Sequence, residues 1–273
     1  MIKTFVQEVL YEDLGRGDLF ERVAQDRETK AKIIAKSEGI FSGEKYLKAL
    51  CELMGVGLKA YKLDSQSFER GEVLAEIEGS YIEILKLERT SLNMLQHSSG
   101  IATHTHTYIN ALGNLPLKLL DTRKTRPLLR EFEKYSVRNG GGHNHRFGLD
   151  DALMLKDTHL ACIDDLKGFV AQAREKLPFT CKIEVECESL EECKRAFESG
   201  VDIVMCDNMT PSAIEQVVAL RNSVYPHILL EASGNITLEN IREYARSGVD
   251  AISSGSLIHQ ATWVDLSMKM QRE

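Results

Sequence analysis

The stretch KIEVECESLEECKRAFESGVDIVMCD (182–207) decides the fold class. Its two apolar runs, 182–186 and 202–207, flank a segment whose apolar residues have helical spacing, which predicts a strand, a helix and a second strand. A helix between consecutive strands is typical of a parallel pair. The same rhythm recurs in the C-terminal part of the chain. Further strands are expected at 117–121, 152–156, 228–231 and 250–255. Six or seven such units without a glycine fingerprint after the first strand favour an α/β barrel over a dinucleotide-binding sheet.

The first 112 residues follow a different rhythm. Residues 31–43 and 71–79 alternate apolar and polar side chains, which predicts antiparallel strands, and 57–63 is a third candidate. The change of rhythm predicts two domains, 1–112 and 113–273. A last helix is expected to pack back on the first domain.

Two helices are expected in this first part. The opening residues predict an amphipathic helix, and Ser80 with Glu83 forms a capping-box pattern ahead of a second, longer helix. That helix is expected to continue to Gly113, with Gly100 as a point where it could end or bend.

Composition excludes several classes of protein. Of the 273 residues, 43% are hydrophobic and 27% are charged, which is typical of a globular protein with a sizeable core. The net charge of −7 argues against nonspecific binding to nucleic acid or anionic lipid. No run reaches the roughly 18 apolar residues of a membrane span, and no signal-peptide pattern opens the chain. The six cysteines contain no CxxC pair and are expected to be free thiols. We therefore expect a cytoplasmic protein.

A charged or hydroxyl residue ends nearly every expected strand. These residues are Asp121, Lys156, Glu186, Asp207, Glu231 and Ser253. Barrel enzymes carry their functional groups at the carboxyl ends of the strands. A single acid there is more often a helix cap, but six polar residues in succession indicate a site at this edge of the sheet.

A cluster of basic residues follows the first of these strands. Residues 118–146 hold eight Lys and Arg against three Asp and Glu, a local excess of five positive charges. A solvated helix face explains the mixed signs of 130–134, but not DTRKTR (121–126), which crowds cations directly after an apolar strand. Arginine matches the geometry of carboxylate and phosphate, so an anionic substrate is the sharper interpretation.

Two His-x-His pairs raise the question of a metal. His104 and His106 lie in an expected helix, where this spacing points them to different faces, so helix polarity is the plainer interpretation. His143 and His145 lie in RNGGGHNHRFG (138–148). The following arginine disfavours a metal, while glycines let backbone N–H groups approach an anion. We interpret this loop as an anion-binding segment in which His143 is structural.

Acids and small turns complete the pattern. Glu186 and Asp207 end successive strands, and paired carboxylates suit Mg²⁺ bound together with substrate phosphates. Glu184 shares a strand face with Glu186, so the pattern alone leaves either as the ligand. The turns EASGN (231–235) and SSGS (253–256) follow later strands, where barrels commonly bind phosphate.

Seven stretches spread over almost the whole chain resemble the quinolinate phosphoribosyltransferase family, the carboxylating nicotinate-nucleotide pyrophosphorylases. They are EDLGRGD (12–18), LERTSLNMLQHSSGIAT (87–103), DTRKTRPLLREFEKYSVRNGGGHNHRFGLDDALMLKDTHL (121–160), IEVE (183–186), MCDNM (205–209), EASGNI (231–236) and GVDAISSGSLIH (248–259). The resemblance implies an N-terminal α/β sandwich domain and a C-terminal open α/β barrel. It also implies a homodimer with shared active sites, or a higher homo-oligomer.

The reaction implied by this resemblance is phosphoribosyl transfer from phosphoribosyl pyrophosphate to quinolinate, with loss of CO₂ and pyrophosphate. The product is nicotinate mononucleotide, in NAD biosynthesis, and the implied cofactor is Mg²⁺. No nucleic-acid or membrane partner is expected.

The matched motifs also imply a role for each site residue. Quinolinate would be held by Arg123, Lys124, His145, Arg146 and Lys156, together with Arg89 of the partner subunit. Glu186, which the family pattern selects over Glu184, and Asp207 would hold Mg²⁺ and the ribose–pyrophosphate. The 5-phosphate would be bound by Ser233, Gly234 and Gly255. The expected catalytic residues are Lys124, Lys156, Glu186 and Asp207. Further substrate-binding candidates in the same motifs are Thr122, Asn235, Ser254 and Ser256, with Arg138 as an additional candidate.

Some positions depart from the family pattern, and three alternatives stay open. Leu19 and Phe20 stand near a usual threonine, His97 replaces a common arginine, and Asn235 replaces the second glycine of its turn. The alternatives are a related transferase with another aromatic carboxylate acceptor, a Schiff-base lyase acting through Lys156, and a non-catalytic anion sensor.

Overall fold

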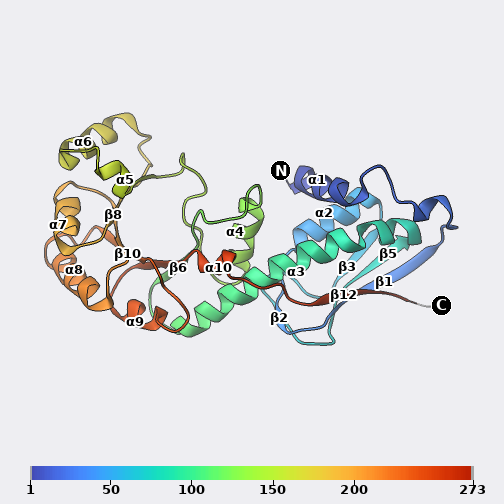
Figure 1. The fold of residues 1–273 in the computed structure, drawn as a ribbon. Helices are drawn as coiled ribbons and strands as arrows, with labels where there is room; N and C mark the ends of the chain where they lie inside the picture. The colour runs from blue at the N-terminus through green and yellow to red at the C-terminus, as the bar shows by residue number, and fades with distance from the viewer. Residues whose placement is uncertain (1, 272–273) are drawn as a thin grey trace. The chain divides into compact units, whose positions relative to one another are not determined.

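The computed structural model of the chain describes residues 2–271, and Figure 1 shows its fold. The chain divides into two compact units. The first comprises Met1–His106, Tyr135–Gly141 and Gln260–Glu273, and the second comprises Thr107–Lys134 and Gly142–His259. The sequence placed one boundary at residue 112, whereas the units interleave along the chain.

An antiparallel sheet forms the centre of the first unit. Its strands, in spatial order, are β12 (Leu266–Met270), β1 (Glu28–Ala35), β5 (Val73–Ser80) and β3 (Gly57–Ala60). A separate antiparallel pair consists of β2 (Gly39–Ile40) and β4 (Ser67–Phe68). Along β1 every second side chain is buried, at Ala31, Ile33 and Ala35, which is the strand period that the sequence predicted.

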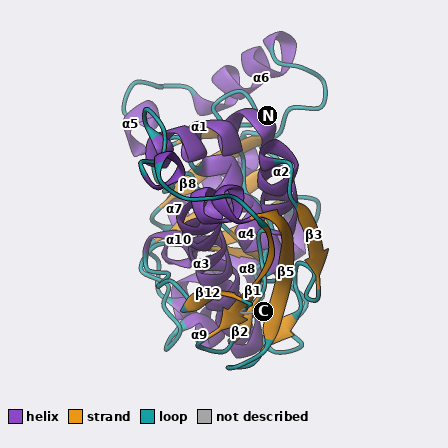
Figure 2. Cartoon of the chain, turned by 90° about the vertical axis from the view of Figure 1, so that its right-hand side faces the viewer, coloured by secondary structure: helices purple, strands orange, loops and turns teal. Residues whose placement is uncertain are grey.

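Helices accompany this sheet. They are α1 (Ile2–Leu14), α2 (Glu44–Met54), the short 3-10 helix η1 (Phe20–Arg22) and most of α3 (Tyr81–Leu112). Figure 2 shows β5 and β3 side by side, in agreement with their pairing. Ser80 caps α3 by accepting a hydrogen bond from the N–H of Glu83 at 3.2 Å.

Gly100 does not end α3, which runs through it. A Cβ at Gly100 would lie 2.2 Å from the carbonyl oxygen of Thr262, so the glycine permits a close approach of two backbones. Although α3 has 32 residues, no helix within residues 2–271 has the combined length and apolar character that crossing a membrane requires.

The last described element is a strand, and the expectation of a last helix is wrong. β12 pairs antiparallel with β1 and places Met268 opposite Ile33. Leu266 and Met268 are buried while Lys269 is exposed, which is the two-residue period of a strand. The edge of β1 offers backbone hydrogen-bond partners, and this tertiary context decides the structure of the segment.

Six parallel strands form the centre of the second unit, as predicted. They are β6 (Lys118–Leu120), β11 (Ala251–Ser253), β10 (Leu229–Ser233), β9 (Ile203–Asp207), β8 (Ile183–Cys187) and β7 (Leu153–Leu155), in spatial order. The first strand of this unit, β6, lies beside its last, β11, as in a barrel. Since β6 and β7 are not paired in the described sheet, the barrel is open.

Helices follow these strands along the chain, and Figure 1 shows α6 to α9 around the sheet. They are α4 (Arg130–Asn139), α5 (Asp157–Leu160), α6 (Leu166–Lys176), α7 (Leu190–Glu198), α8 (Pro211–Val224), α9 (Ile241–Arg246) and α10 (Ser256–His259). Side-chain caps explain where several begin: Ser189 accepts a hydrogen bond from Glu192 N–H, and Thr210 accepts one from Ala213 N–H.

Candidate active site

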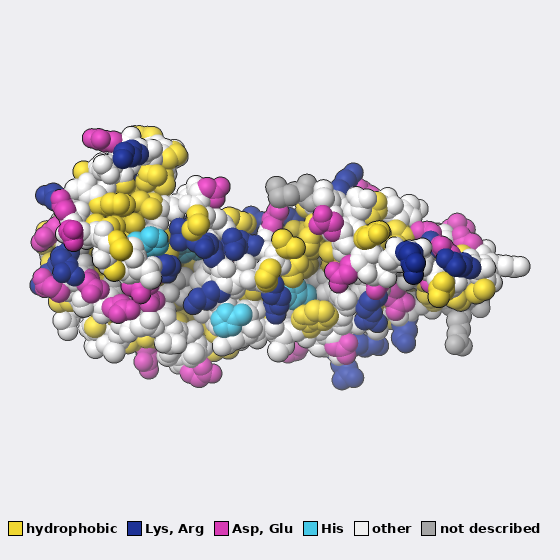
Figure 3. All heavy atoms as spheres, turned by 45° about the horizontal axis from the view of Figure 1, so that its top comes forward, with side chains coloured by type: hydrophobic (Ala, Val, Ile, Leu, Met, Phe, Trp, Pro, Cys, Tyr) yellow, Lys and Arg dark blue, Asp and Glu magenta, His cyan; other side chains and the backbone are white. Residues whose placement is uncertain are grey.

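A cavity of about 390 Å³ lies at the carboxyl ends of the strands in the second unit. The predicted residues that line it are Thr122, Arg123, Lys124, His145, Arg146, Lys156, Glu186, Asp207 and Ser233. The remaining lining residues are Met154, Met205 and Ser253. The space-filling view shows Lys and Arg side chains gathered beside histidine on the face displayed (Figure 3).

A buried ion pair fixes the loop that carries His145 and Arg146. Lys134 and Asp121 form a salt bridge, and both side chains are fully buried. Lys134 Nζ also donates to the carbonyl oxygen of His145 at 2.8 Å, and Asp121 accepts the N–H of His145 at 2.9 Å. Asn144 Nδ2 donates to Asp121 at 2.5 Å and to the carbonyl of Lys134 at 2.9 Å. The backbone of His145 is therefore held from within the second unit, and this sets the direction of its side chain.

His143 takes part through its backbone. Its N–H donates to the carbonyl of Leu119 at 2.7 Å, and its carbonyl accepts the N–H of Asp121 at 3.0 Å. The residue thus extends the edge of β6, and its side chain is exposed. This arrangement supports the structural interpretation of His143.

Two arginines lie close together at the cavity. Arg146 Nη1 donates to the carbonyl of Ala152 at 2.9 Å, which orients the guanidinium. Burial lowers the pKa of Arg146, and the positive charge of Arg123 lowers it further. Two like charges held near each other favour a bound anion, because an anion removes their repulsion.

Another part of the cavity lining combines one lysine, Lys156, with two carboxylates, Glu186 and Asp207. Lys156 is paired with Glu186, and their side chains are 43% and 12% exposed. Burial raises the pKa of Asp207, and the negative charge of Glu186 raises it further. The positive charges of Lys156 and Lys124 act in the opposite direction but do not outweigh these two effects. Two hard carboxylates that repel each other beside a cavity fit the ligand chemistry of Mg²⁺.

The turn after β10 explains the departure at Asn235. Gly234 has a φ of 89°, and a Cβ there would lie 2.7 Å from the backbone N of Asn208. Asn235 also has a positive φ, 51°, a conformation that asparagine tolerates better than most residues. Its Nδ2 donates to Asn208 Oδ1 at 3.0 Å. Asparagine therefore keeps the left-handed backbone of the turn and adds a bond to the neighbouring strand end.

In the second turn predicted to bind phosphate, SSGS (253–256), the serine side chains are buried. Ser254 and Ser256 are each 7% exposed, and their Oγ atoms lie 2.6 Å apart. Ser256 Oγ also contacts the hydroxyl of Tyr108 at 2.8 Å. A Cβ at Gly255 would lie 2.8 Å from Lys124 Cδ, so the glycine makes room for a lysine of the cavity. The hydroxyls of Ser254 and Ser256 thus form hydrogen bonds within the turn and to Tyr108.

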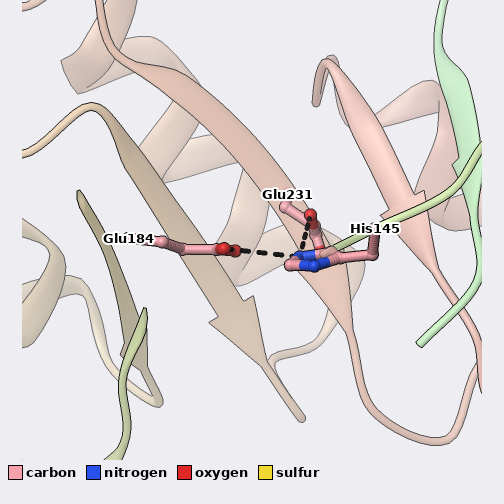
Figure 4. Close-up of side chains that lie close together, drawn as sticks. All are labelled: His145, Glu184 and Glu231. Atoms are coloured by element: carbon pink, nitrogen blue, oxygen red, sulfur yellow. Dashed lines mark ion pairs between the residues drawn. The ribbon is translucent and has the colours of Figure 1, made fainter. Parts of the chain in front are cut away.

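A second charged layer lies beneath these strand ends. His145 inserts between Glu184 of β8 and Glu231 of β10 (Figure 4). Its Nε2 lies 3.3 Å from Glu184 Oε2 and 3.4 Å from Glu231 Oε2. We call these three residues the His145 cluster. Burial alone would lower the pKa of His145, but the hydrogen bonds to both carboxylates outweigh it and raise the pKa to about 10. The ring Nδ1 accepts the N–H of Arg146 at 2.8 Å, so the proton that the cluster retains lies among Nε2 and the carboxylates.

Sequence reasoning missed Met154 and Met205 at this site, and the pairing of Glu184 and Glu231 with His145, although a signal existed. Met154, Glu184, Met205 and Glu231 each stand two residues before a strand-end residue of the cavity, namely Lys156, Glu186, Asp207 and Ser233. The two-residue period of a strand places each on the same face, one layer deeper. Arg89 of α3 and Arg138 of α4 are exposed residues of the first unit.

Comparison with known proteins identifies one family over nearly the whole chain. The family described as Quinolinate phosphoribosyl transferase, N-terminal domain, matches residues 18–99, and its C-terminal domain matches 101–269. A Bacillus subtilis protein described as a probable carboxylating nicotinate-nucleotide pyrophosphorylase is 38% identical over 98% of this chain and 92% of its own.

Solved structures agree. NadC from Streptococcus pyogenes is 39% identical, with a TM-score of 0.92 over 99% of this chain and 96% of its own. The nicotinate-nucleotide pyrophosphorylase from Francisella tularensis is 34% identical, with a TM-score of 0.91 over the same shares.

Proposed function

Because the chain belongs to the quinolinate phosphoribosyl transferase family, we propose that it transfers phosphoribosyl from phosphoribosyl pyrophosphate to quinolinate. The products are nicotinate mononucleotide, CO₂ and pyrophosphate, and the enzyme is a carboxylating nicotinate-nucleotide pyrophosphorylase of NAD biosynthesis. The observation that carries the proposal is the cavity in which Arg123, Arg146 and Lys156 accompany Glu186 and Asp207.

The charges of the cavity suit both substrates. Quinolinate carries two carboxylates on a planar ring, and the arginines with Lys124 and Lys156 offer donors for both. In the transfer, the bond from ribose C1 to a pyrophosphate oxygen breaks as the ring nitrogen donates its lone pair to C1. The transition state has oxocarbenium character, so positioning and electrostatics supply most of the catalysis.

Decarboxylation follows from the charge on the product. As CO₂ leaves, the electron pair of the broken bond stays on the ring carbon, where the positive charge of the adjacent substituted nitrogen stabilises it. A proton then takes the place of CO₂ on the ring. On this mechanism Lys156 and Arg123 bind carboxylate and need not transfer a proton.

We also propose Glu186 and Asp207 as the ligands of Mg²⁺. The raised pKa of Asp207 reflects burial and the repulsion of Glu186, which a divalent cation would relieve. When bound, Mg²⁺ would neutralise negative charge that develops on the departing pyrophosphate.

An acceptor assay tests the proposed reaction. Purified protein with phosphoribosyl pyrophosphate and Mg²⁺ is expected to release pyrophosphate and CO₂ in equal amounts when quinolinate is present. Nicotinate in place of quinolinate is expected to react far more slowly, because it lacks one carboxylate. Faster turnover of nicotinate would favour the related transferase with another aromatic carboxylate acceptor.

A homodimer with shared sites is part of the proposal, with Arg89 supplied by the partner subunit. Arg89→Ala and Lys156→Ala variants are each expected to lose nearly all activity at a quinolinate concentration near the wild-type KM. After subunit exchange, a mixture should regain about a quarter of the wild-type sites, because half of the dimers are mixed and each has one intact site. No recovery in a mixture that exchanges subunits would place Arg89 in the site of its own chain or outside it. A cytoplasmic location stays a prediction.

A further inference from the structure

The His145 cluster is unusual because its carboxylates are buried and only partly satisfied. Glu184 is 1% exposed and Glu231 is 3% exposed. The second oxygen of each, Oε1, has no hydrogen-bond partner among the described residues. Buried carboxylates without full pairing cost free energy. Two of them facing one ring therefore indicate a role other than stability.

The ring geometry indicates that the cluster holds a proton rather than a metal ion. The three ligand atoms lie within 4.8 Å of one another, a spacing that a metal could also bridge. However, His145 Nδ1 accepts the N–H of Arg146 at 2.8 Å, so the Nε2 nitrogen carries the ring proton. A protonated Nε2 donates to carboxylates and has no lone pair for a metal.

The same geometry connects the carboxylates to the substrate cavity. Glu184 and Glu231 orient the imidazole through Nε2, and the imidazole orients the peptide N–H of Arg146 through Nδ1. The guanidinium of Arg146 is fixed separately by the carbonyl of Ala152. The chain of contacts thus ends at an arginine that lines the cavity.

We propose that Glu184 and Glu231 are positioning residues for quinolinate binding, which act by holding His145 and, through it, Arg146. His145 then contributes to the acceptor site through Arg146, since both of its ring nitrogens already have partners within the protein. The inference rests on the proposed function, because it requires that Arg146 binds a carboxylate of quinolinate.

Isosteric variants test the proposal by kinetics. Glu231→Gln and Glu184→Gln are each expected to raise the KM for quinolinate about tenfold, and the double variant about a hundredfold. The KM for phosphoribosyl pyrophosphate should change less than about twofold, since the contacts through His145 lead to Arg146 and not to its expected ligands. The matched control is Glu215→Gln on an exposed face of α8, which should leave both constants unchanged.

This pattern separates positioning from a general structural effect. A variant that merely folds less well would lower the amount of active enzyme and leave both KM values at the wild-type level. Equal changes in both KM values, or no change in either, would overturn the inference. Absence of quinolinate turnover in the wild type would instead overturn the proposed function.

The tautomer of His145 gives a second, spectroscopic test, whose main readout is on the wild-type protein. In ¹⁵N-histidine-labelled wild-type protein, the ring is expected to carry a proton on Nε2, with the signal assigned by His145→Asn. A proton on Nδ1 alone would contradict the proposal. So would a divalent metal that survives dialysis against chelator and is lost in Glu231→Gln, because the cluster would then be a metal site.

Discussion

The second unit contains two lysine–carboxylate pairs that differ in burial and in partners. Lys134 and Asp121 are fully buried, and each also bonds the backbone of His145. Lys156 is 43% exposed, its partner Glu186 is 12% exposed, and both line the cavity. The first pair holds the backbone of a loop, whereas the second can exchange its internal contact for substrate or metal. Each pair consists of a lysine and a carboxylate, so residue type alone does not distinguish them. Burial and the additional partners show which pair supports the fold and which is available for binding.

Lys134→Met should have the largest effect, on stability. The substitution leaves Asp121 as a buried charge without its cation, which is expected to lower the free energy of unfolding by about 3–5 kcal/mol. Urea unfolding followed by circular dichroism measures the loss. The double variant Lys134→Met/Asp121→Asn removes both charges and should recover part of it. A loss below about 1 kcal/mol in the single variant would show that the pair does not hold the loop.

Lys156→Ala is expected to lower activity strongly and stability only slightly. Because the pair is half exposed, its removal is expected to change the unfolding free energy by no more than about 1 kcal/mol. The kcat/KM for quinolinate is expected to fall about a hundredfold through a raised KM, as a charged hydrogen bond to substrate is lost. Steady-state kinetics and direct quinolinate binding measure this. Intact binding with abolished turnover would instead assign Lys156 to proton transfer.

Glu186→Gln tests the other half of the exposed pair. The amide keeps the shape of the side chain but weakens a hard-cation ligand, so the Mg²⁺ concentration for half-maximal activity is expected to rise about tenfold. A magnesium titration of the initial rate measures the shift, with Glu215→Gln as the control. An unchanged titration would place the metal elsewhere.

Asp202 has a side chain whose burial is intermediate between those of the two pairs, and its removal is expected to have a smaller effect. It is 18% exposed and pairs with Arg174 at 2.6 Å and Lys182 at 3.1 Å. Burial acts to raise its pKa, but the Ile183 N–H and the two cations outweigh burial and lower it. A lowered folded-state pKa stabilises the protein above the ordinary Asp value of about 3.9 and loses that effect as pH falls through the lowered value.

Asp202→Asn should therefore cost about 1 kcal/mol at pH 6 and progressively less toward pH 3. Unfolding free energies of both proteins across this range measure the difference. A difference that grows on acidification would give the pKa shift the opposite sign.

The sequence predicted elements that depend on local periods. All six parallel strands and nine residues of the cavity followed from apolar runs, strand-end polarity and motif resemblance. The insertion of His145 between Glu184 and Glu231 did not, because it depends on a loop that Lys134 and Asp121 hold from different parts of the chain.

β12 shows the same limit in the first unit. Its five residues have too little local preference to choose between helix and strand, and pairing with β1 decides the outcome. At Asn235, in contrast, local preference and structure agree. The backbone has the positive φ that is expected of the family's glycine, and asparagine tolerates this conformation.

The pairing of β12 with β1 also sets an order of events during synthesis. β5 pairs with one edge of β1 and emerges from the ribosome soon after it, but the partner of the other edge begins only at Leu266. At about 5–20 residues per second, the growing chain carries an unpaired strand edge for roughly ten to fifty seconds. During that interval β1 is open to pairing with other chains. A pause in translation before residue 266 would prolong the time for which this strand edge is unpaired.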